Sequence, residues 1–145
     1  MDILDDVIFY HIERAIKSYR QFAQARIKKL GHDITIDQWL VLKVLSDNPD
    51  IPQKDLATAV FKDNASVTRI IDLLVQKKLV VRQHHKVDGR RATLKITGSG
   101  HKTISKIGTI VALNRKLAQA GIKQNELDAA KRVMRRISNN CSGTT

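Results

Sequence analysis

The 145-residue sequence contains little cysteine, proline, glycine or aromatic side chain, and each shortage excludes a class of protein. A single cysteine, Cys141, excludes an intramolecular disulfide framework and a metal site built on cysteines. Two prolines and seven glycines favour long helices over many short strands. No run of about 18 apolar residues occurs, so we expect no transmembrane helix. Because the acidic start MDILDD lacks the basic-then-apolar order of a signal peptide, we expect a cytoplasmic protein.

Motifs of catalysis and of cofactor binding are also missing. The sequence contains no H-E-x-x-H, G-x-S-x-G, P-loop or dinucleotide fingerprint. Its five histidines are scattered, and the adjacent pair His84 and His85 is more typical of solvated side chains than of a metal site. The segment TGSG at 97–100 fits the start of a helix better than a phosphate loop. We therefore expect neither an enzyme nor a bound cofactor or metal.

Positive charge is what the sequence has in excess. The formal net charge is +12 and the sequence pI is about 10.1. A surplus of this size predicts a polyanionic partner, and DNA, RNA, an anionic membrane surface and an acidic protein all fit. Solubility alone is the plainer interpretation, but the charge is not spread evenly. With 42% hydrophobic residues, the chain is also long enough for a single domain, residues 1–145, with its own core.

Long amphipathic helices are predicted at both ends of the chain. Over about residues 2–30, apolar side chains recur at helical spacing, at Ile8, Ile12, Ile16, Tyr19, Phe22, Ala23, Ile27 and Leu30. Residues 98–140 predict two more helices that separate at Gly121, with Leu127, Val133 or Met134, and Ile137 expected to face inward on the last one. A domain of this size rarely needs a helix of about 40 Å for its own core, so we expect a dimer interface. The final segment CSGTT is expected to fray.

The middle of the chain predicts a helix-turn-helix. Thr35 and Gln38 have the spacing of a capping box at the start of one helix. After Pro49 and Pro52, Gln53–Val60 predicts a short amphipathic helix, and Asp63 is a suitable N-cap for another from Asn64 to about Lys77. On this last helix the residues expected to be buried are Val67, Ile70, Ile71 and Leu74, and those expected to face outward are Ser66, Thr68, Arg69 and Asp72. Two helices joined by a short turn, the second with a polar N-terminal half, are typical of this motif.

A β-hairpin is predicted directly after these helices, over Leu79–Thr97. In its second strand, apolar and polar residues alternate, and Asp88-Gly89 is a strong hairpin signal because glycine supplies a positive φ. From Arg82 to Lys95 five basic side chains accompany the single acid Asp88, which gives the hairpin a net charge of +4. The predicted fold class is therefore mainly α with a small β-hairpin wing, a winged helix-turn-helix over about residues 35–97 between long terminal helices.

The segment Gln53–Thr97 resembles the MarR family of dimeric winged-helix transcription regulators. The matching motifs are Val67-Thr68-Arg69 with Leu74 on the second helix, then Asp88-Gly89-Arg90 in the wing and Ile96-Thr97 at its end. Helices on both sides extend the resemblance over nearly the whole chain. The family often has glycine at the position of Lys78, so Lys78 is expected either to adopt a left-handed conformation or to end its helix differently.

The resemblance implies a homodimer whose two second helices enter successive major grooves of a pseudo-palindromic DNA operator. The expected base and phosphate contacts on and before that helix are Lys54, Lys62, Asn64, Ser66, Thr68 and Arg69. Arg69 has the alternatives of an intrahelical pair with Asp72 or a solvated side chain, and Asn64 the alternative of a cap residue.

A basic wing suits the minor groove, where the electrostatic potential is negative. Its expected DNA contacts are Lys86, Arg90 and Arg91, with Arg90 as the inserted residue by resemblance. Asp88 is expected to accept hydrogen bonds within the turn and to orient Arg90, while Gly89 makes the tip more mobile.

A small anionic or aromatic effector is the other partner that the resemblance implies. The candidate lining residues are Tyr10, His11, Tyr19 and Trp39, each of which also fits a core or interface position. The chain lacks the first-helix cysteine of the family's peroxide sensors. The predicted function is a sequence-specific regulator of transcription, a repressor relieved by its effector; the alternative is a nonspecific architectural nucleic-acid-binding protein. A membrane partner is not expected, because the basic residues gather on the wing and recognition helix rather than along one amphipathic face.

Overall fold

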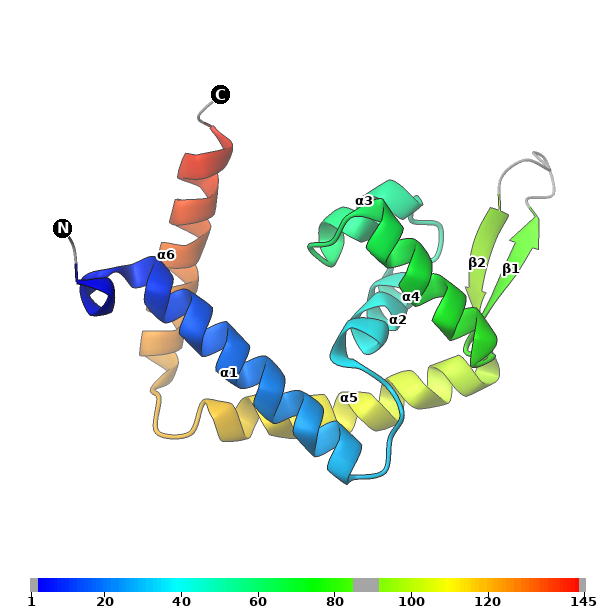
Figure 1. Ribbon diagram of the computed structural model, residues 1–145, viewed down its shortest axis with the longest axis horizontal. Helices are drawn as coiled ribbons and strands as arrows, with labels where there is room; N and C mark the ends of the chain where they lie inside the picture. Colours follow the sequence, from blue (N-terminus) through cyan, green and yellow to red (C-terminus); the bar gives the residue numbers. More distant parts are fainter. Residues whose placement is uncertain (1–2, 85–91, 144–145) are drawn as a thin grey trace. The chain divides into compact units, whose positions relative to one another are not determined.

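The computed structural model describes residues 3–84 and 92–143 of the chain, and it is mainly helical with one hairpin (Figure 1). In chain order the elements are the 3-10 helix η1 Leu4–Asp6, then α1 Ile8–Lys29, α2 Ile36–Asp47, α3 Gln53–Ala59, α4 Asn64–Gln76, β1 Val80–His84, β2 Ala92–Ile96, α5 Gly98–Ala118 and α6 Gln124–Ser142. The predicted fold class is confirmed. The chain divides into two compact units, one ending at Asn114 and the other beginning at Arg115.

Side-chain caps fix where several helices start. The Thr35 hydroxyl accepts a hydrogen bond from the Gln38 backbone N–H at 3.0 Å, and the Gln38 side chain accepts one from the Thr35 N–H at 3.2 Å, as the capping-box pattern predicts. Asp63 caps α4 through the Ser66 N–H at 2.7 Å. Thr97 caps α5 through the Gly100 N–H at 3.0 Å.

Two predicted helix boundaries are wrong at the ends of the chain. The first helix does not begin near residue 2, because Val7 has extended backbone angles that separate the short η1 from α1. The last helix does not end before CSGTT. Cys141 and Ser142 belong to its final turn, where the Ser142 hydroxyl donates to the Ser138 carbonyl at 2.7 Å.

Three helices end in the same hydrogen-bonded turn, the Schellman motif, which requires a residue with positive φ just after the helix. Gly31 fills that position after α1, with φ of 87°. Phe61 fills it after α3 with φ of 59°, and Lys78 after α4 with φ of 60°. Lys78 therefore adopts the first of its two predicted conformations. Both non-glycine residues are strained, at a cost of about 1 kcal/mol each.

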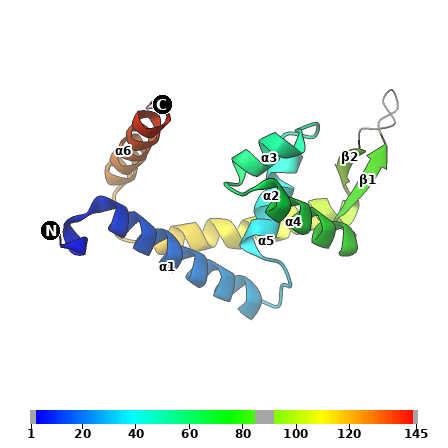
Figure 2. The same ribbon diagram turned by 45° about the horizontal axis from the view of Figure 1, so that its top comes forward.

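The core lies where α2, α3, α4 and the base of the hairpin meet, and Figures 1 and 2 show these elements side by side. Its fully buried large side chains are Ile27, Val41, Leu42, Leu56, Val67, Ile71, Leu74, Val80 and Ile107. The buried Trp39 donates its indole N–H to the Ile104 carbonyl at 3.2 Å, which ties α2 to α5. Strands β1 and β2 pair antiparallel with Val80 opposite Ile96. This packing holds α4 and the hairpin in fixed register.

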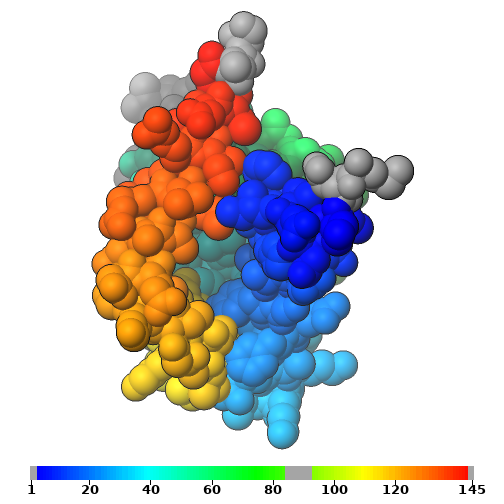
Figure 3. Space-filling model, turned by 90° about the vertical axis from the view of Figure 1, so that its left-hand side faces the viewer, coloured from blue at the N-terminus to red at the C-terminus, as the bar shows by residue number. Residues whose placement is uncertain are grey.

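The terminal helices bury little of their apolar surface within one chain. On α1 only Ala23 and Ile27 are buried, although seven positions of the predicted apolar stripe lie on this helix. Figure 3 looks onto this helix (blue), whose side chains lie at the surface. No residue of α6 is fully buried: Leu127 and Ile137 of the expected inward stripe are half-buried, whereas Val133 and Met134 are exposed. These exposed apolar faces are what a partner surface would cover, and the dimer stays a prediction.

Candidate nucleic-acid interface

Helix α4 presents one apolar face to the core and one polar face to solvent. Val67, Ile71 and Leu74 are buried, as predicted, and the helix has a strong amphipathic pattern. At its start, hydrogen bonds from the Ser66 backbone and side chain hold the pKa of Asp63 below its usual range. The carboxylate therefore stays charged at neutral pH and caps the helix. Asp63, rather than Asn64, is the N-cap.

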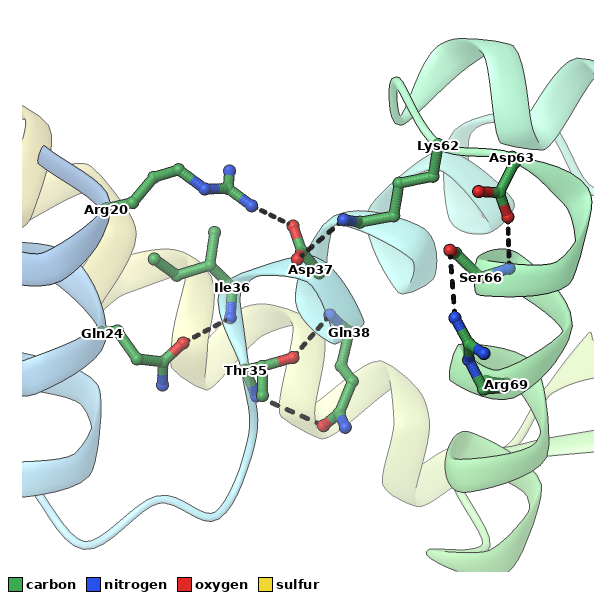
Figure 4. Close-up of polar contacts among 10 residues, drawn as sticks. All are labelled: Arg20, Gln24, Thr35, Ile36, Asp37, Gln38, Lys62, Asp63, Ser66 and Arg69. Carbon is green, nitrogen blue, oxygen red and sulfur yellow. Dashed lines mark hydrogen bonds and ion pairs between the residues drawn. The ribbon is translucent and has the colours of Figure 1, made fainter. Parts of the chain in front are cut away.

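The outward face of α4 carries the polar residues that the sequence predicted there. Asn64, Thr68 and Arg69 are exposed, and Ser66 is half-buried. The Arg69 guanidinium donates to the Ser66 hydroxyl at 3.3 Å, within one turn of the helix (Figure 4). The alternative pair of Arg69 with Asp72 is not formed, because Asp72 pairs with Arg82 of β1. Arg69 and Ser66 thus form one polar cluster near the start of α4.

Thr68 lies on the other flank of this face and joins α4 to α3. Its hydroxyl accepts a hydrogen bond from the Gln53 side-chain amide at 2.8 Å and donates to the Asn64 carbonyl at 2.9 Å. Gln53 is the first residue of α3, and sequence reasoning did not single it out. The two helices of the motif are therefore joined by a polar contact at the edge of the exposed face.

Lys54 and Lys62 are in different surroundings. Lys54 is exposed on α3. The Lys62 side chain is only 28% exposed, and its ammonium nitrogen lies 3.2 Å from Asp37 Oδ2. Asp37, at the start of α2, also accepts a charged hydrogen bond from Arg20 of α1 (Figure 4). To contact a phosphate, the Lys62 ammonium would have to break its ion pair with Asp37 or to bind the phosphate and the carboxylate together.

The bridge Arg20–Asp37–Lys62 connects α1, α2 and the turn before α4, and no sequence pattern pointed to it. Burial alone would raise the pKa of Asp37, but the hydrogen bonds and charges of Arg20 and Lys62 outweigh it and lower that pKa. Gln24 strengthens the same junction. Its amide oxygen accepts from the Ile36 N–H at 2.9 Å, and its amide nitrogen donates to the Ile34 carbonyl at 3.2 Å. The position of α1 is thereby coupled to the start of α2.

The base of the hairpin is tied to α4. Arg82 on β1 pairs with Asp72 on α4, and Thr93 on β2 donates its hydroxyl proton to the Gln83 carbonyl at 3.2 Å. The predicted wing residues Lys86, Asp88, Gly89, Arg90 and Arg91 lie outside the described residues. Their roles stay predictions.

The four candidate effector residues are not gathered in one place. Tyr10 and His11 are exposed near the start of α1, where their rings meet edge to face and Arg14 lies over the Tyr10 ring. Tyr19 is nine residues further along the same helix, about 13 Å from Tyr10. Trp39 is 6% exposed and belongs to the core. A cavity of about 490 Å³ lies elsewhere, and its lining includes Ile51, Gln53, Ile71, Arg82, Thr93 and Leu94.

The described residues provide no group of three or more histidine, cysteine, aspartate or glutamate side chains that could hold a metal ion. Within the same ranges, no helix is long and apolar enough to cross a membrane.

Comparison with known proteins identifies the fold and the family. The family model described as MarR family matches residues 32–91. A candidate transcriptional regulatory protein for the hcr operon of Thauera aromatica is 31% identical over 99 residues, which are 68% of this chain and 58% of that relative. The chain therefore spans less than two thirds of the length of this relative.

Solved structures share the whole arrangement of elements. Bordetella bronchiseptica BpsR, whose DNA binding is regulated by 6-hydroxynicotinic acid, has a TM-score of 0.85 at 21% identity over 95% of this chain and 97% of its own. MepR of S. aureus, solved in complex with DNA, has a TM-score of 0.81 at 20% identity over 94% and 98%. The family model identifies residues 32–91 as MarR family, and the two solved structures, at 20–21% identity, show that the chain has the same fold.

Proposed function

We propose that the chain is a sequence-specific, double-stranded DNA-binding transcription regulator that acts as a homodimer. The observation that carries the proposal is the exposed polar face of α4. The opposite, apolar face of the helix is buried in the core, and a basic hairpin follows the helix directly in the chain. The net charge of +12 supplies the attraction to phosphate that any such interface needs. MepR, which shares the fold, was solved in complex with DNA.

Base recognition is assigned to the exposed start of α4. Arg69 binds guanine through two donors, and Asn64 has the donor and acceptor that adenine requires. Releasing Arg69 from the Ser66 hydroxyl costs little, because that contact is 3.3 Å long and solvent-exposed. Ser66 and Thr68 reach bases or phosphates, and Lys54 and Lys62 contact the phosphate backbone. In the wing, Arg90 enters the minor groove with Asp88 as its orienting partner, flanked by Lys86 and Arg91.

The apolar surface that one chain leaves exposed supports the proposed homodimer. Large apolar side chains are about half exposed on α1, at Ile8, Phe9 and Ile16. The same holds on α6 for Val133 and Met134. A two-fold dimer places two recognition helices about 34–36 Å apart on one DNA face. The operator is therefore pseudo-palindromic, with half-sites one helical turn apart.

Repression relieved by a small effector completes the proposal. The DNA binding of BpsR, which has the same fold, is regulated by 6-hydroxynicotinic acid, a small aromatic acid. For this chain two places are candidates. One is the α1 surface with Tyr10, His11 and Tyr19; Trp39, the fourth residue predicted for this role, belongs to the core. The other is the cavity beside the hairpin, where Arg82, which also pairs with Asp72, lies among apolar and polar side chains.

Selection of bound sequences from a random duplex library tests the proposal. The full-length protein is expected to enrich an inverted repeat. Arg69→Ala is expected to weaken binding by about tenfold or more and to relax the preference at one position in each half-site. Arg132→Ala, which removes the same charge from the exposed surface of α6, is the matched control and leaves the preference unchanged.

Two results distinguish the alternatives. An architectural nucleic-acid-binding protein would enrich no sequence and would bind all duplexes with similar affinity and strong salt dependence. For the wing, Arg90→Ala is expected to weaken operator binding tenfold or more while the dimer stays folded. An unchanged affinity in an electrophoretic titration would remove Arg90 from the interface.

A further inference from the structure

Phe61 is the most exposed large apolar side chain among the described residues, at 92%. Most other exposed apolar side chains lie on η1, α1, α5 and α6, where a second subunit would cover them. Between residues 35 and 97 the only others of this kind in the described ranges are Leu73 at 42% and Val81 at 40%. An aromatic ring left almost fully in water forgoes the free energy that its burial would contribute. Its exposure is therefore not explained by the dimer or by the core.

The backbone conformation of Phe61 is one in which a phenylalanine is rare. Its φ of 59° closes the turn after α3, with the Phe61 N–H donating to Thr58 and the Lys62 N–H donating to Ala57 at 2.9 Å. The turn needs a positive φ but no side chain, and Gly31 makes the same turn after α1 without strain. A bulky residue in this conformation is an outlier that points to a role for the side chain.

The surroundings of Phe61 are those of the proposed DNA interface. It follows α3 and stands two residues before the N-cap Asp63, so it lies at the N-terminal end of α4, the end to which base recognition is assigned above. A shallow hollow is lined by Ala57, Thr58, Phe61, Lys62, Asp63 and Ser66. Phe61 and Ser66 therefore border the same surface, and Arg69 donates to Ser66. A ring here lies next to both hydroxyl and cationic groups of the interface.

We propose that Phe61 contacts the 5-methyl group of a thymine at the edge of the major groove and selects thymine at that position. The thymine methyl is the apolar feature of the major groove, and phenylalanine is among the side chains that meet it. The contact buries part of the exposed ring without needing a hydrogen bond from it. The inference rests on the proposed function, since it adds one position to the same interface.

The test begins with the duplex that the wild-type protein selects from a random library. Each thymine of that duplex is replaced in turn by deoxyuridine, which removes only the methyl group. Loss of one buried methyl is expected to weaken wild-type binding about fourfold, and about fifteenfold when both half-sites are changed. Phe61→Gly is expected to bind the unmodified duplex as weakly as the wild type binds the doubly substituted one, and to be insensitive to deoxyuridine at that position.

Phe61→Gly also separates the ring from the backbone, because glycine adopts the required φ without strain. The melting temperature of the variant is expected to be at least that of the wild type, while its affinity for the duplex falls. A residue with a merely structural role would not lower the affinity without lowering the melting temperature. Lys78→Gly relieves the same strain at the other end of α4 and is the control; its deoxyuridine pattern is expected to match the wild type.

Each other outcome overturns a distinct statement. If the wild type selects no sequence, the proposed function and the inference both fail. If the wild type selects an operator that Phe61→Gly binds equally well, only the role of Phe61 fails. If Phe61→Gly loses affinity but keeps the wild-type response to deoxyuridine, the thymine contact is wrong. If sedimentation shows that Phe61→Gly separates the subunits, the ring belongs to a protein interface instead.

Discussion

Two glycines of α5 lead to opposite expectations for the same substitution. A methyl group placed on Gly100 would lie 2.2 Å from the Leu79 carbonyl oxygen and 2.6 Å from Ile96 Cγ2. That carbonyl cannot turn away freely, since it accepts a hydrogen bond from the Thr97 N–H at 3.1 Å. A methyl group on Gly108 would meet nothing closer than Trp39 Cζ2 at 3.8 Å, an ordinary contact. Gly100→Ala must therefore push the start of α5 away from the hairpin, whereas Gly108→Ala fits.

The size of each effect follows from two opposing contributions. Alanine is favoured over glycine within a helix by up to about 1 kcal/mol, and less in the first turn where Gly100 lies. Forcing a methyl group into a closed site costs roughly 1–3 kcal/mol. We expect Gly100→Ala to lower the free energy of unfolding by about 2 kcal/mol and Gly108→Ala to raise it by about 0.5–1 kcal/mol. At roughly 3 °C per kcal/mol for a chain of this size, the two melting temperatures should differ by about 8 °C.

Urea unfolding followed by far-ultraviolet circular dichroism measures the two changes in the free energy of unfolding. All variants are compared at one protein concentration, because the stability of a dimer depends on concentration. Fluorescence of Trp39, the only tryptophan, gives a second probe of the core. The close approach of α5 to Leu79 and Ile96 at the base of the hairpin would be refuted by a Gly100→Ala variant as stable as the wild type. It would also be refuted if Gly100→Ala and Gly108→Ala changed the free energy of unfolding in the same direction.

Three further expectations concern the junction, the strained turn and the interface. Because the pKa of Asp37 is lowered in the folded chain, its charge stabilises the protein above its ordinary pKa near 3.8 and this contribution is lost as the pH falls through the lower folded value. Asp37→Asn should therefore unfold more easily than the wild type at pH 7, by about 0.5–1 kcal/mol after solvent screening, and the gap in urea unfolding should close below pH 3.8; a gap that persists in acid would contradict the bridge. Lys78→Gly should raise the free energy of unfolding by about 1 kcal/mol, whereas Lys77→Gly should lower it because the Lys77 ammonium donates to Gln38 at 3.1 Å; thermal melts of the pair check both signs. Arg69→Ala should leave the melting temperature within about 2 °C of the wild type, since its side chain is exposed, and a larger drop would mean that Arg69 supports the fold.

Local patterns explain why much of the fold was predictable. The capping pair Thr35 and Gln38 and the cap Asp63 act over three residues, so their geometry follows from spacing alone. The apolar stripe of α4 was also predictable, because its buried face packs within the same unit. The left-handed residue after α4 was foreseen only as one of two choices, since a lysine there gives no signal by itself.

Long-range contacts explain what the sequence could not reveal. Arg20, Asp37 and Lys62 are far apart in the chain and meet only because α1 and the turn before α4 both reach the start of α2. The Asp72–Arg82 pair likewise depends on the hairpin folding back beside α4. The inward stripe expected for α6 is only partly buried for a different reason. Periodicity shows that a face seeks a partner but not whether that partner is in the same chain.

The affinity ratio between a selected duplex and a shuffled duplex of equal length and composition tests the central claim most directly. Both are titrated against the full-length protein at the same physiological salt concentration. Sequence-specific recognition by α4 and the wing predicts a ratio of about a thousand or more. A ratio below about ten would contradict it, because phosphate attraction alone would then account for the binding.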